Sequence, residues 1–139
     1  MKIAYQGIAG SYSESCAKEK YPNCETIPCK TFDECFEKAN NDSSVKAIIP
    51  ESNKTTGNIG VEYLIFKYRL NIYAEHFFPI KHNLLGIKGS NLESIKNVYS
   101  HAQALSQSSN FIKKNNLIEN VRADTAGSAK YISDTNNKT

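Results

Sequence analysis

The fold is decided by residues 2–14, KIAYQGIAGSYSE, which place a strand, a glycine loop and a helix start in direct succession. Lys2–Gln6 is short and mainly apolar, so it is predicted to form a β-strand. The loop Gly7–Gly10 ends that strand. Ser11 and Glu14 form a capping box of the pattern Ser-x-x-Glu, in which the glutamate side chain reaches back to the cap. A strand that passes through a tight loop into a helix is typical of α/β proteins.

The same alternation continues along the first half of the chain. Glu25–Cys29 is predicted to be a second strand, and Thr31–Glu34 is a second capping box that opens a helix. Val45–Ile49 is predicted to be a third strand, and its apolar character indicates a central position in the sheet. The longest helix is expected over Gly57–Arg69. Its buried face is expected to consist of Ile59, Tyr63, Phe66 and Leu70.

Shorter elements are expected in the second half of the chain. They are extended segments at Asn71–Phe78 and His82–Ile87, a strand at Val98-Tyr99, a helix from the capping box Ser100–Gln103 to about Asn115, a strand at Ile118–Arg122 and a helix at Thr125–Ile132. The polar residues 134–139 show no pattern of a strand or helix. A change of lobe in the extended region predicts a first α/β lobe at residues 1–74 and a second at residues 75–139.

The composition argues against several classes of protein. Of the 139 residues, 40% are hydrophobic and 22% are charged, which is too apolar for a disordered chain. No apolar run approaches the ~20 residues of a membrane span, and the start lacks the apolar region of a secretory signal. The 17 basic residues are dispersed, and only Lys113 and Lys114 are adjacent, unlike a nucleic-acid-binding face. A cytoplasmic protein without nucleic-acid or membrane partners is expected.

Cysteines and histidines give weak signals of chemistry. The 4 cysteines lack the Cys-x2-Cys pairs of a zinc site, and no histidine lies near enough in sequence to complete one. His76 and His82 are interpreted as structural residues in or near strands. His101 follows a cap, and a place in a cleft stays open for it. No Gly-rich nucleotide-binding motif occurs, which argues against a nucleotide-dependent enzyme.

Four strand-to-helix junctions are rich in glycine and hydroxyl residues. They are Gly7–Ser13, Pro50–Gly57, Ser100–Gln103 and Asp124–Gly127. In α/β folds the ligand lies outside the carboxyl ends of the strands, where backbone N–H groups and hydroxyls can bind carboxylates. Ser100, Gln103 and Gln107 are expected on one helix face, at spacings of three and four residues. From the residues alone, the alternative of ordinary helix caps stays open.

Taken in order, these junctions resemble the motifs of the prephenate dehydratase family. GIAGSYS at Gly7–Ser13 is similar to Gly-Pro-x-Gly-Thr-Phe/Tyr-Ser, and PESNKTTG at Pro50–Gly57 looks like Pro-Ile-Glu-Asn-Ser-x-x-Gly. YSHAQALSQ at Tyr99–Gln107 is close to Tyr-Ser-His-Pro-Gln-Ala-Leu-x-Gln, the most specific of the four. DTAGSA at Asp124–Ala129 resembles Ser-Thr-Ala-x-Ala-Ala. The resemblance spans the whole chain.

The chain departs from the family pattern at two points. In the ungapped register the family glutamate of the second motif falls on Ser52, Asn53 is kept and Lys54 replaces the family serine. A gap of one residue would instead align Glu51 with that glutamate. The family's Thr-Arg-Phe motif, whose threonine is regarded as essential, is expected beyond Thr139, because no Thr-Arg pair occurs in the sequence. The chain is therefore expected to be a fragment that is nearly inactive alone.

The resemblance implies an α/β fold of two-lobed, periplasmic-binding-protein-like (type 2) architecture with the second lobe incomplete. It implies a lyase that converts prephenate to phenylpyruvate, water and carbon dioxide in phenylalanine biosynthesis. No metal or cofactor is implied, and the complete protein is expected to be a homo-oligomer. An arogenate or cyclohexadienyl dehydratase and a non-catalytic small-carboxylate-binding module remain alternatives. The expected catalytic residues are Asn53 and Gln107, and the expected substrate-binding residues are Ser11, Ser100, Gln103 and Thr125.

Overall fold

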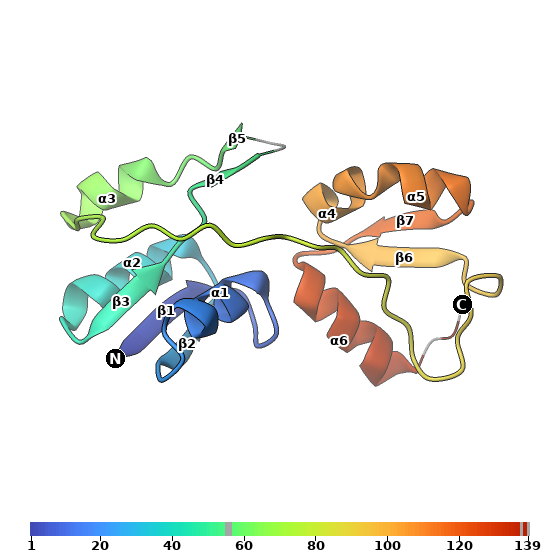
Figure 1. Ribbon diagram of the computed structural model, residues 1–139, viewed down its shortest axis with the longest axis horizontal. Coiled ribbons are helices and arrows are strands. Elements are labelled where there is room, and N and C mark those ends of the chain that lie inside the picture. The colour runs from blue at the N-terminus through green and yellow to red at the C-terminus, as the bar shows by residue number, and fades with distance from the viewer. Residues whose placement is uncertain (55–56, 137, 139) are drawn as a thin grey trace. The chain divides into compact units, whose positions relative to one another are not determined.

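A computed structural model describes residues 1–54, 57–136 and 138 of the chain (Figure 1). The chain divides into two compact units, Met1–Pro79 and Ile80–Thr139. The sequence placed this division after Ala74, earlier in the chain. The later boundary has a physical reason, because residues just after Ala74 contact the first unit: Lys20 Nζ donates to the carbonyl of Glu75 at 2.9 Å.

The first unit is built on a parallel sheet of three strands in the order β2-β1-β3. The strands are β1 (Lys2–Gln6), β2 (Glu25–Cys29) and β3 (Val45–Ile48), all close to their predicted bounds. The central strand is β1, not the third strand as the sequence indicated. The apolar run of β3 is interrupted by the exposed Lys46, whereas the three middle residues of β1 are buried on both faces of the sheet.

Two helices cover this sheet. They are α1 (Tyr12–Lys20) and α2 (Phe32–Asn41), and both begin at the predicted capping boxes. Crossovers between parallel strands are right-handed, and β2 and β3 lie on opposite sides of β1, so the two helices cover opposite faces (Figure 1). The core against α2 contains the buried side chains of Ala4, Cys29, Cys35 and Val45.

The region after β3 differs from the expected long helix. Residues Ser52–Asn53 (β4) and Gly57–Asn58 (β5) pair as antiparallel strands, and α3 begins only at Glu62 and ends at Tyr68. Gly57 has a φ of +76°, which lies outside the helical region and explains the late start.

The helix α3 also buries a different face from the expected one. Tyr63 and Phe66 are 63% and 81% exposed, whereas Val61 and Leu64 are buried. Tyr68 stacks on Phe36 of α2 with ring centroids 6.0 Å apart, so α3 packs through its Leu64 and Tyr68 face. The period of the apolar residues was compatible with both faces.

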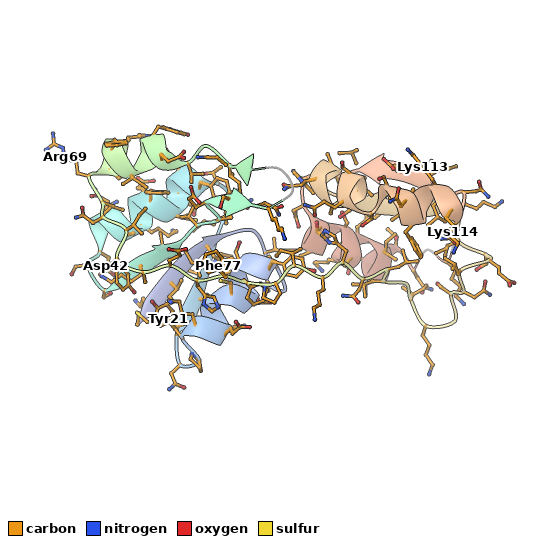
Figure 2. All side chains as sticks on the ribbon, turned by 45° about the horizontal axis from the view of Figure 1, so that its top comes forward. Tyr21, Asp42, Arg69, Phe77, Lys113 and Lys114 are labelled. Carbon is orange, nitrogen blue, oxygen red and sulfur yellow. The ribbon has the colours of Figure 1, made fainter. Side chains whose placement is uncertain are left out.

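Residues 70–87 form no strand in the described part of the chain, although their apolar pattern predicted two extended segments there. The segment that belongs to the first unit contacts α1 through side chains. The Tyr73 hydroxyl lies 3.0 Å from that of Tyr21, and His76 Nε2 lies 2.9 Å from a Glu19 carboxylate oxygen. Phe77 is 85% exposed (Figure 2). Without a neighbouring strand to pair with, apolar alternation alone does not produce a β-strand.

The described residues of the second unit form two parallel strands and three helices. They are β6 (Asn97–Ser100), α4 (Ala102–Gln107), α5 (Ser109–Lys114), β7 (Ile118–Val121) and α6 (Thr125–Thr135). The core between them contains the buried side chains of Leu105, Ile112 and Leu117. Lys113 and Lys114, the adjacent lysines, extend from the last turn of α5 (Figure 2).

Two predicted boundaries in this unit change. The helix expected from residue 102 to about Asn115 is divided at Ser108, whose backbone N–H donates to the carbonyls of Ala104 and Leu105. The last helix continues to Thr135, into the tail that showed no pattern, and its last turn is supported by an exposed ion pair between Lys130 and Asp134. Within the described residues, no helix is long and apolar enough to span a bilayer.

Candidate functional site

The β1–α1 loop is shaped by two glycines and a helix cap. Gly7 and Gly10 have φ values of +121° and +87°, a region that L side chains rarely adopt. The Gly7 N–H donates to the Cys29 carbonyl at 2.9 Å, which ties the start of the loop to the end of β2. Ser11, a predicted substrate-binding residue, is the N-cap of α1, and its Oγ accepts from the Glu14 N–H at 3.3 Å.

Glu14 makes contacts that a simple capping box does not predict. Its Oε2 accepts from the Gly10 N–H at 2.7 Å, and not from the N–H of the cap residue Ser11. Its Oε1 accepts from Lys18 Nζ at 2.8 Å and from Thr26 Oγ1 at 3.0 Å. Glu14 is only 8% exposed. One carboxylate therefore joins the glycine loop, helix α1 and strand β2.

These contacts hold Glu14 in its charged form. The hydrogen bond from Lys18, followed by the one from the Gly10 N–H, lowers the pKa of the Glu14 carboxyl below its usual value, although burial acts in the opposite direction. A helix N-terminus also favours a negative charge. The carboxylate is therefore a permanent part of the loop at neutral pH.

Asn53, a predicted catalytic residue, lies half-buried in β4, opposite Gly57 of β5. Its neighbours Glu51 and Ser52, the two candidates for the position of the family glutamate, are both exposed. Residues 55 and 56 of the same motif lie outside the described residues. The placement of Asn53 in the substrate site therefore stays a prediction.

In the second unit, two predicted site residues are in direct contact. Ser100 Oγ donates to Thr125 Oγ1 at 3.0 Å, and Ser100 is only 7% exposed. The sequence suggested that Ser100 caps the following helix. In the structure Ser100 ends strand β6 and is not the cap. The cap is His101, whose Nδ1 accepts from the Gln103 N–H at 3.3 Å. The neighbouring helix start supplies Thr125, and this long-range partner explains the different role of Ser100.

Gln103 and Gln107 both lie half-buried in α4, as the spacing predicted. Ser100 does not share that helix face, because it belongs to β6. The Gln107 Oε1 lies 2.6 Å from His82 Nε2, so the histidine donates and faces the oxygen end of the carboxamide. His82 was interpreted as structural, and no local pattern connects it with a residue so far along the chain.

The last of the four junctions, Asp124–Gly127, begins with a helix cap, since Asp124 is the N-cap of α6. Asp124 Oδ1 accepts from the Gly127 N–H, and a Cβ at Gly127 would lie 2.7 Å from Asp124 Oδ2. The buried Ser128 donates through Oγ to the Asp124 carbonyl at 2.7 Å. The Arg122 guanidinium lies 4.0 Å from the centre of the Tyr131 ring. These contacts fix the start of α6, where Thr125 is the first helical residue.

The structure thus brings together Ser100 with Thr125 in one unit, and it joins Gln107 to His82 in the same unit. Ser11 and Asn53 belong to the other unit. Sequence reasoning missed the Glu14–Thr26 contact and the His82–Gln107 contact, since both join residues that are distant in sequence. Across the described ranges, no group of three or more His, Cys, Asp or Glu side chains could hold a metal ion.

Comparisons with known proteins identify a family for this chain. The sequence model of prephenate dehydratase matches residues 3–139. Arogenate dehydratase 2 of Petunia hybrida is 43% identical over 133 residues, which cover 95% of this chain and 34% of the relative. The chloroplastic arogenate dehydratase/prephenate dehydratase 2 of Arabidopsis thaliana is 41% identical over 133 residues, which cover 95% of this chain and 35% of the relative. The chain spans about a third of the length of these relatives.

Solved structures give the same fold. GqqA, described as a novel type of quorum quenching acylase, has a TM-score of 0.88 and 30% identity, and the match covers 99% of this chain and 51% of GqqA. The prephenate dehydratase of Staphylococcus aureus has a TM-score of 0.68 and 22% identity, and the match covers 95% of this chain and 51% of that structure. These likenesses confirm the predicted α/β fold of the periplasmic-binding-protein-like (type 2) class.

The comparisons correct the predicted location. A cytoplasmic protein was expected, but several relatives, among them those from Arabidopsis thaliana at 41% and 42% identity, are chloroplastic by name. The expectation was wrong because it rested on the absence of a secretory signal. Such an absence does not distinguish the cytoplasm from an organelle.

Proposed function

Because this chain belongs to the prephenate dehydratase family, we propose that it forms part of the substrate site of an enzyme that converts prephenate to phenylpyruvate in phenylalanine biosynthesis. The observation that supports this most is the order of four junction motifs within a family match that runs from residue 3 to residue 139. Three of these junctions begin a capped helix directly after a parallel strand.

The proposed reaction needs anion binding and help for a leaving group. The bond between the ring and its carboxylate breaks, carbon dioxide leaves, and the electron pair of that bond enters the ring. The ring hydroxyl departs from the opposite carbon and takes up a proton to become water. Because aromatisation drives this change, the protein mainly has to hold two carboxylates and donate to the departing hydroxyl.

The described hydroxyls are suited to the binding part of this task. Since Ser100 donates to Thr125, the Thr125 hydroxyl keeps its own hydrogen for a further acceptor. We assign substrate binding to this pair together with Ser11 and Gln103. We assign the orientation of the substrate at the reacting carbons to Asn53 and Gln107, with His82 fixing the oxygen end of the Gln107 carboxamide.

The donor to the departing hydroxyl is proposed to lie outside these 139 residues. The family threonine regarded as essential belongs to a Thr-Arg-Phe motif, and the sequence contains no Thr-Arg pair. We therefore expect the isolated chain to bind substrate and to turn it over very slowly.

Arogenate is the second candidate substrate. The relatives that are 43% and 41% identical are named arogenate dehydratase and arogenate dehydratase/prephenate dehydratase. Arogenate carries an amino group where prephenate carries a keto group, and the ring chemistry is the same. The same residues would serve both substrates, so affinity for the side chain decides between them.

Calorimetric titration of the 139-residue chain with prephenate and with arogenate tests this proposal. Binding of either compound is expected, together with phenylpyruvate or phenylalanine formation close to the uncatalysed rate. Thr125→Val should weaken binding about 10-fold, which corresponds to the loss of one hydrogen bond to a charged group.

Thr31→Val is the matched control, because Thr31 also stands at a helix start but caps α2 outside the proposed site. It should leave the affinity within about two-fold of that of the unchanged chain. A folded chain that binds neither compound contradicts the proposed site. Rapid turnover by this chain contradicts the need for the Thr-Arg-Phe motif.

A further inference from the structure

Two capping boxes of the first unit start from the same sequence pattern and have different surroundings. Glu34 of the second box accepts from the Lys30 N–H at 2.8 Å and pairs with Lys38 at 3.4 Å. Glu14 of the first box makes the corresponding contacts, with Gly10 and Lys18. The side chain of Glu34 is 35% exposed, whereas that of Glu14 is 11% exposed.

The additional contact of Glu14 is the hydrogen bond from Thr26 of strand β2. It fixes Glu14 to the sheet and not only to its own helix. The loop is thereby anchored at both ends, since the Gly7 N–H donates to the Cys29 carbonyl and the Gly10 N–H to Glu14. Glycine is the residue with the most backbone freedom, so a loop with two glycines needs such anchors to keep one conformation.

We propose that Glu14 is a positioning residue that locks the Gly7–Ser11 loop in the conformation in which Ser11 and the start of α1 receive a carboxylate of the ligand. This inference rests on the proposed function for the identity of the ligand. The lock itself rests on two hydrogen bonds of the Glu14 carboxylate, one from the Gly10 N–H and one from Thr26 Oγ1 of β2.

A buried carboxylate next to a carboxylate-binding loop requires charge compensation. Lys18 supplies it at 2.8 Å, and its side chain is 55% exposed, so it can be changed without opening the core. Lys18→Met should therefore weaken anion binding through charge and leave the loop in place. Loss of Glu14 should release the loop. The two variants thus separate the effect of the Lys18 charge on anion binding from the effect of Glu14 on the position of the loop.

The experiment measures amide hydrogen exchange and prephenate affinity on the ¹⁵N-labelled full chain. Glu14→Ala should speed exchange of the Gly10 amide at least about 10-fold and raise the prephenate Kd about 10-fold. Exchange of the amides of Ala4 and Tyr5, which are buried in β1, should stay slow relative to Gly10. A merely structural role would speed exchange in β1 by the same factor as in the loop.

The conservative variant and the matched control sharpen this test. Glu14→Gln keeps an acceptor oxygen for the Gly10 N–H, so it should restore most of the Gly10 protection and part of the affinity. Glu34→Ala should leave Gly10 exchange and the prephenate Kd within about two-fold, and speed exchange at Lys30 instead. If Glu14→Ala does not fold, Thr26→Val provides the same comparison, because it removes only the contact to β2.

The outcomes separate this inference from the proposed function. Unchanged Gly10 exchange in Glu14→Ala overturns the lock. Faster Gly10 exchange with an unchanged prephenate Kd overturns the positioning role. If the unchanged chain binds no prephenate, the proposed function fails for this chain, and Gly10 exchange alone then supports or overturns the lock.

Discussion

The β1–α1 junction of the first unit and the β6/β7–α6 junction of the second, which are both proposed to bind the ligand, hold their donor groups in different ways. The first uses a charged network around the buried carboxylate of Glu14. The second uses two neutral hydroxyls, Ser100 and Thr125, and a cap at Asp124 that serves the helix alone. Charged hydrogen bonds are stronger and depend on pH, so the two junctions should respond very differently to mutation and to acid.

The largest difference is expected from Glu14→Ala. Its carboxylate accepts hydrogen bonds from the Gly10 N–H and from Thr26 in a buried place, and each such bond to a charged group is worth about 1.5 kcal/mol net. The bond from the largely exposed Lys18 adds little, so the free energy of unfolding should fall by about 3 kcal/mol. Urea unfolding followed by circular dichroism measures it. Glu34→Ala, in the exposed box, should produce a clearly smaller loss. Equal losses in both variants would contradict the distinction drawn from burial.

The next effect is expected at the start of the same loop. Gly7→Ala places a side chain at a φ of +121°, with its Cβ 3.3 Å from the Ser11 side chain. Strain of this kind costs about 2 kcal/mol. Gly10→Ala is the comparison, because its Cβ would meet no atom within 4 Å and only the φ of +87° would oppose it. A larger loss at Gly10 than at Gly7 would show that crowding against the cap is unimportant.

A smaller effect is expected in the second unit. Ser100→Ala removes one neutral hydrogen bond to Thr125 and should reduce the free energy of unfolding by about 1 kcal/mol. The prephenate Kd should also rise, because the Thr125 hydroxyl loses the partner that orients it. Ser106→Ala, at an exposed position of α4, provides the control. A cost at Ser100 as large as that at Glu14 would remove the contrast between the two junctions.

The smallest effect is the dependence of stability on acid. The pKa of Glu14 is lowered in the folded chain from 4.5, so its contribution is complete above the unfolded pKa. It is lost as the pH falls from about 4.5 through the folded pKa. Glu14→Gln should remove this part of the acid sensitivity, measured by urea unfolding between pH 6 and pH 3. Ser100→Ala should keep the same pH dependence as the unchanged chain.

Local patterns predicted β1, β2, β3, α1 and α2 of the first unit well, but not the elements that follow β3. The strand Lys2–Gln6 and the caps Ser11 and Thr31 depend on neighbouring residues, and the structure has them where the sequence indicated. The central place of β1 could not be predicted in this way. It depends on which strands pair, and an apolar run such as Val45–Ile48 is compatible with an edge as well as a centre.

The candidate site was less predictable because its contacts join residues that are distant in the sequence. Ser100 looked like a cap from its own neighbours, but the hydroxyl of Thr125 gives it another partner. Gln107 was recognised by its motif, whereas its contact with His82 has no local signal. The role of Glu14 was half predicted: the capping box predicted the reach back toward the helix start, and the buried contact with Thr26 appeared only in the fold.

The most direct test of the account is a prephenate titration of the ¹⁵N-labelled chain, followed by amide chemical shifts. If the two prepared junctions bind the ligand, the amides near Ser11 and Thr125 should shift along one common binding curve. The amides near Thr31, at the exposed capping box, should stay unchanged. Shifts at Thr31 that equal those at Ser11 and Thr125, or no shift at either of those two, would contradict the account.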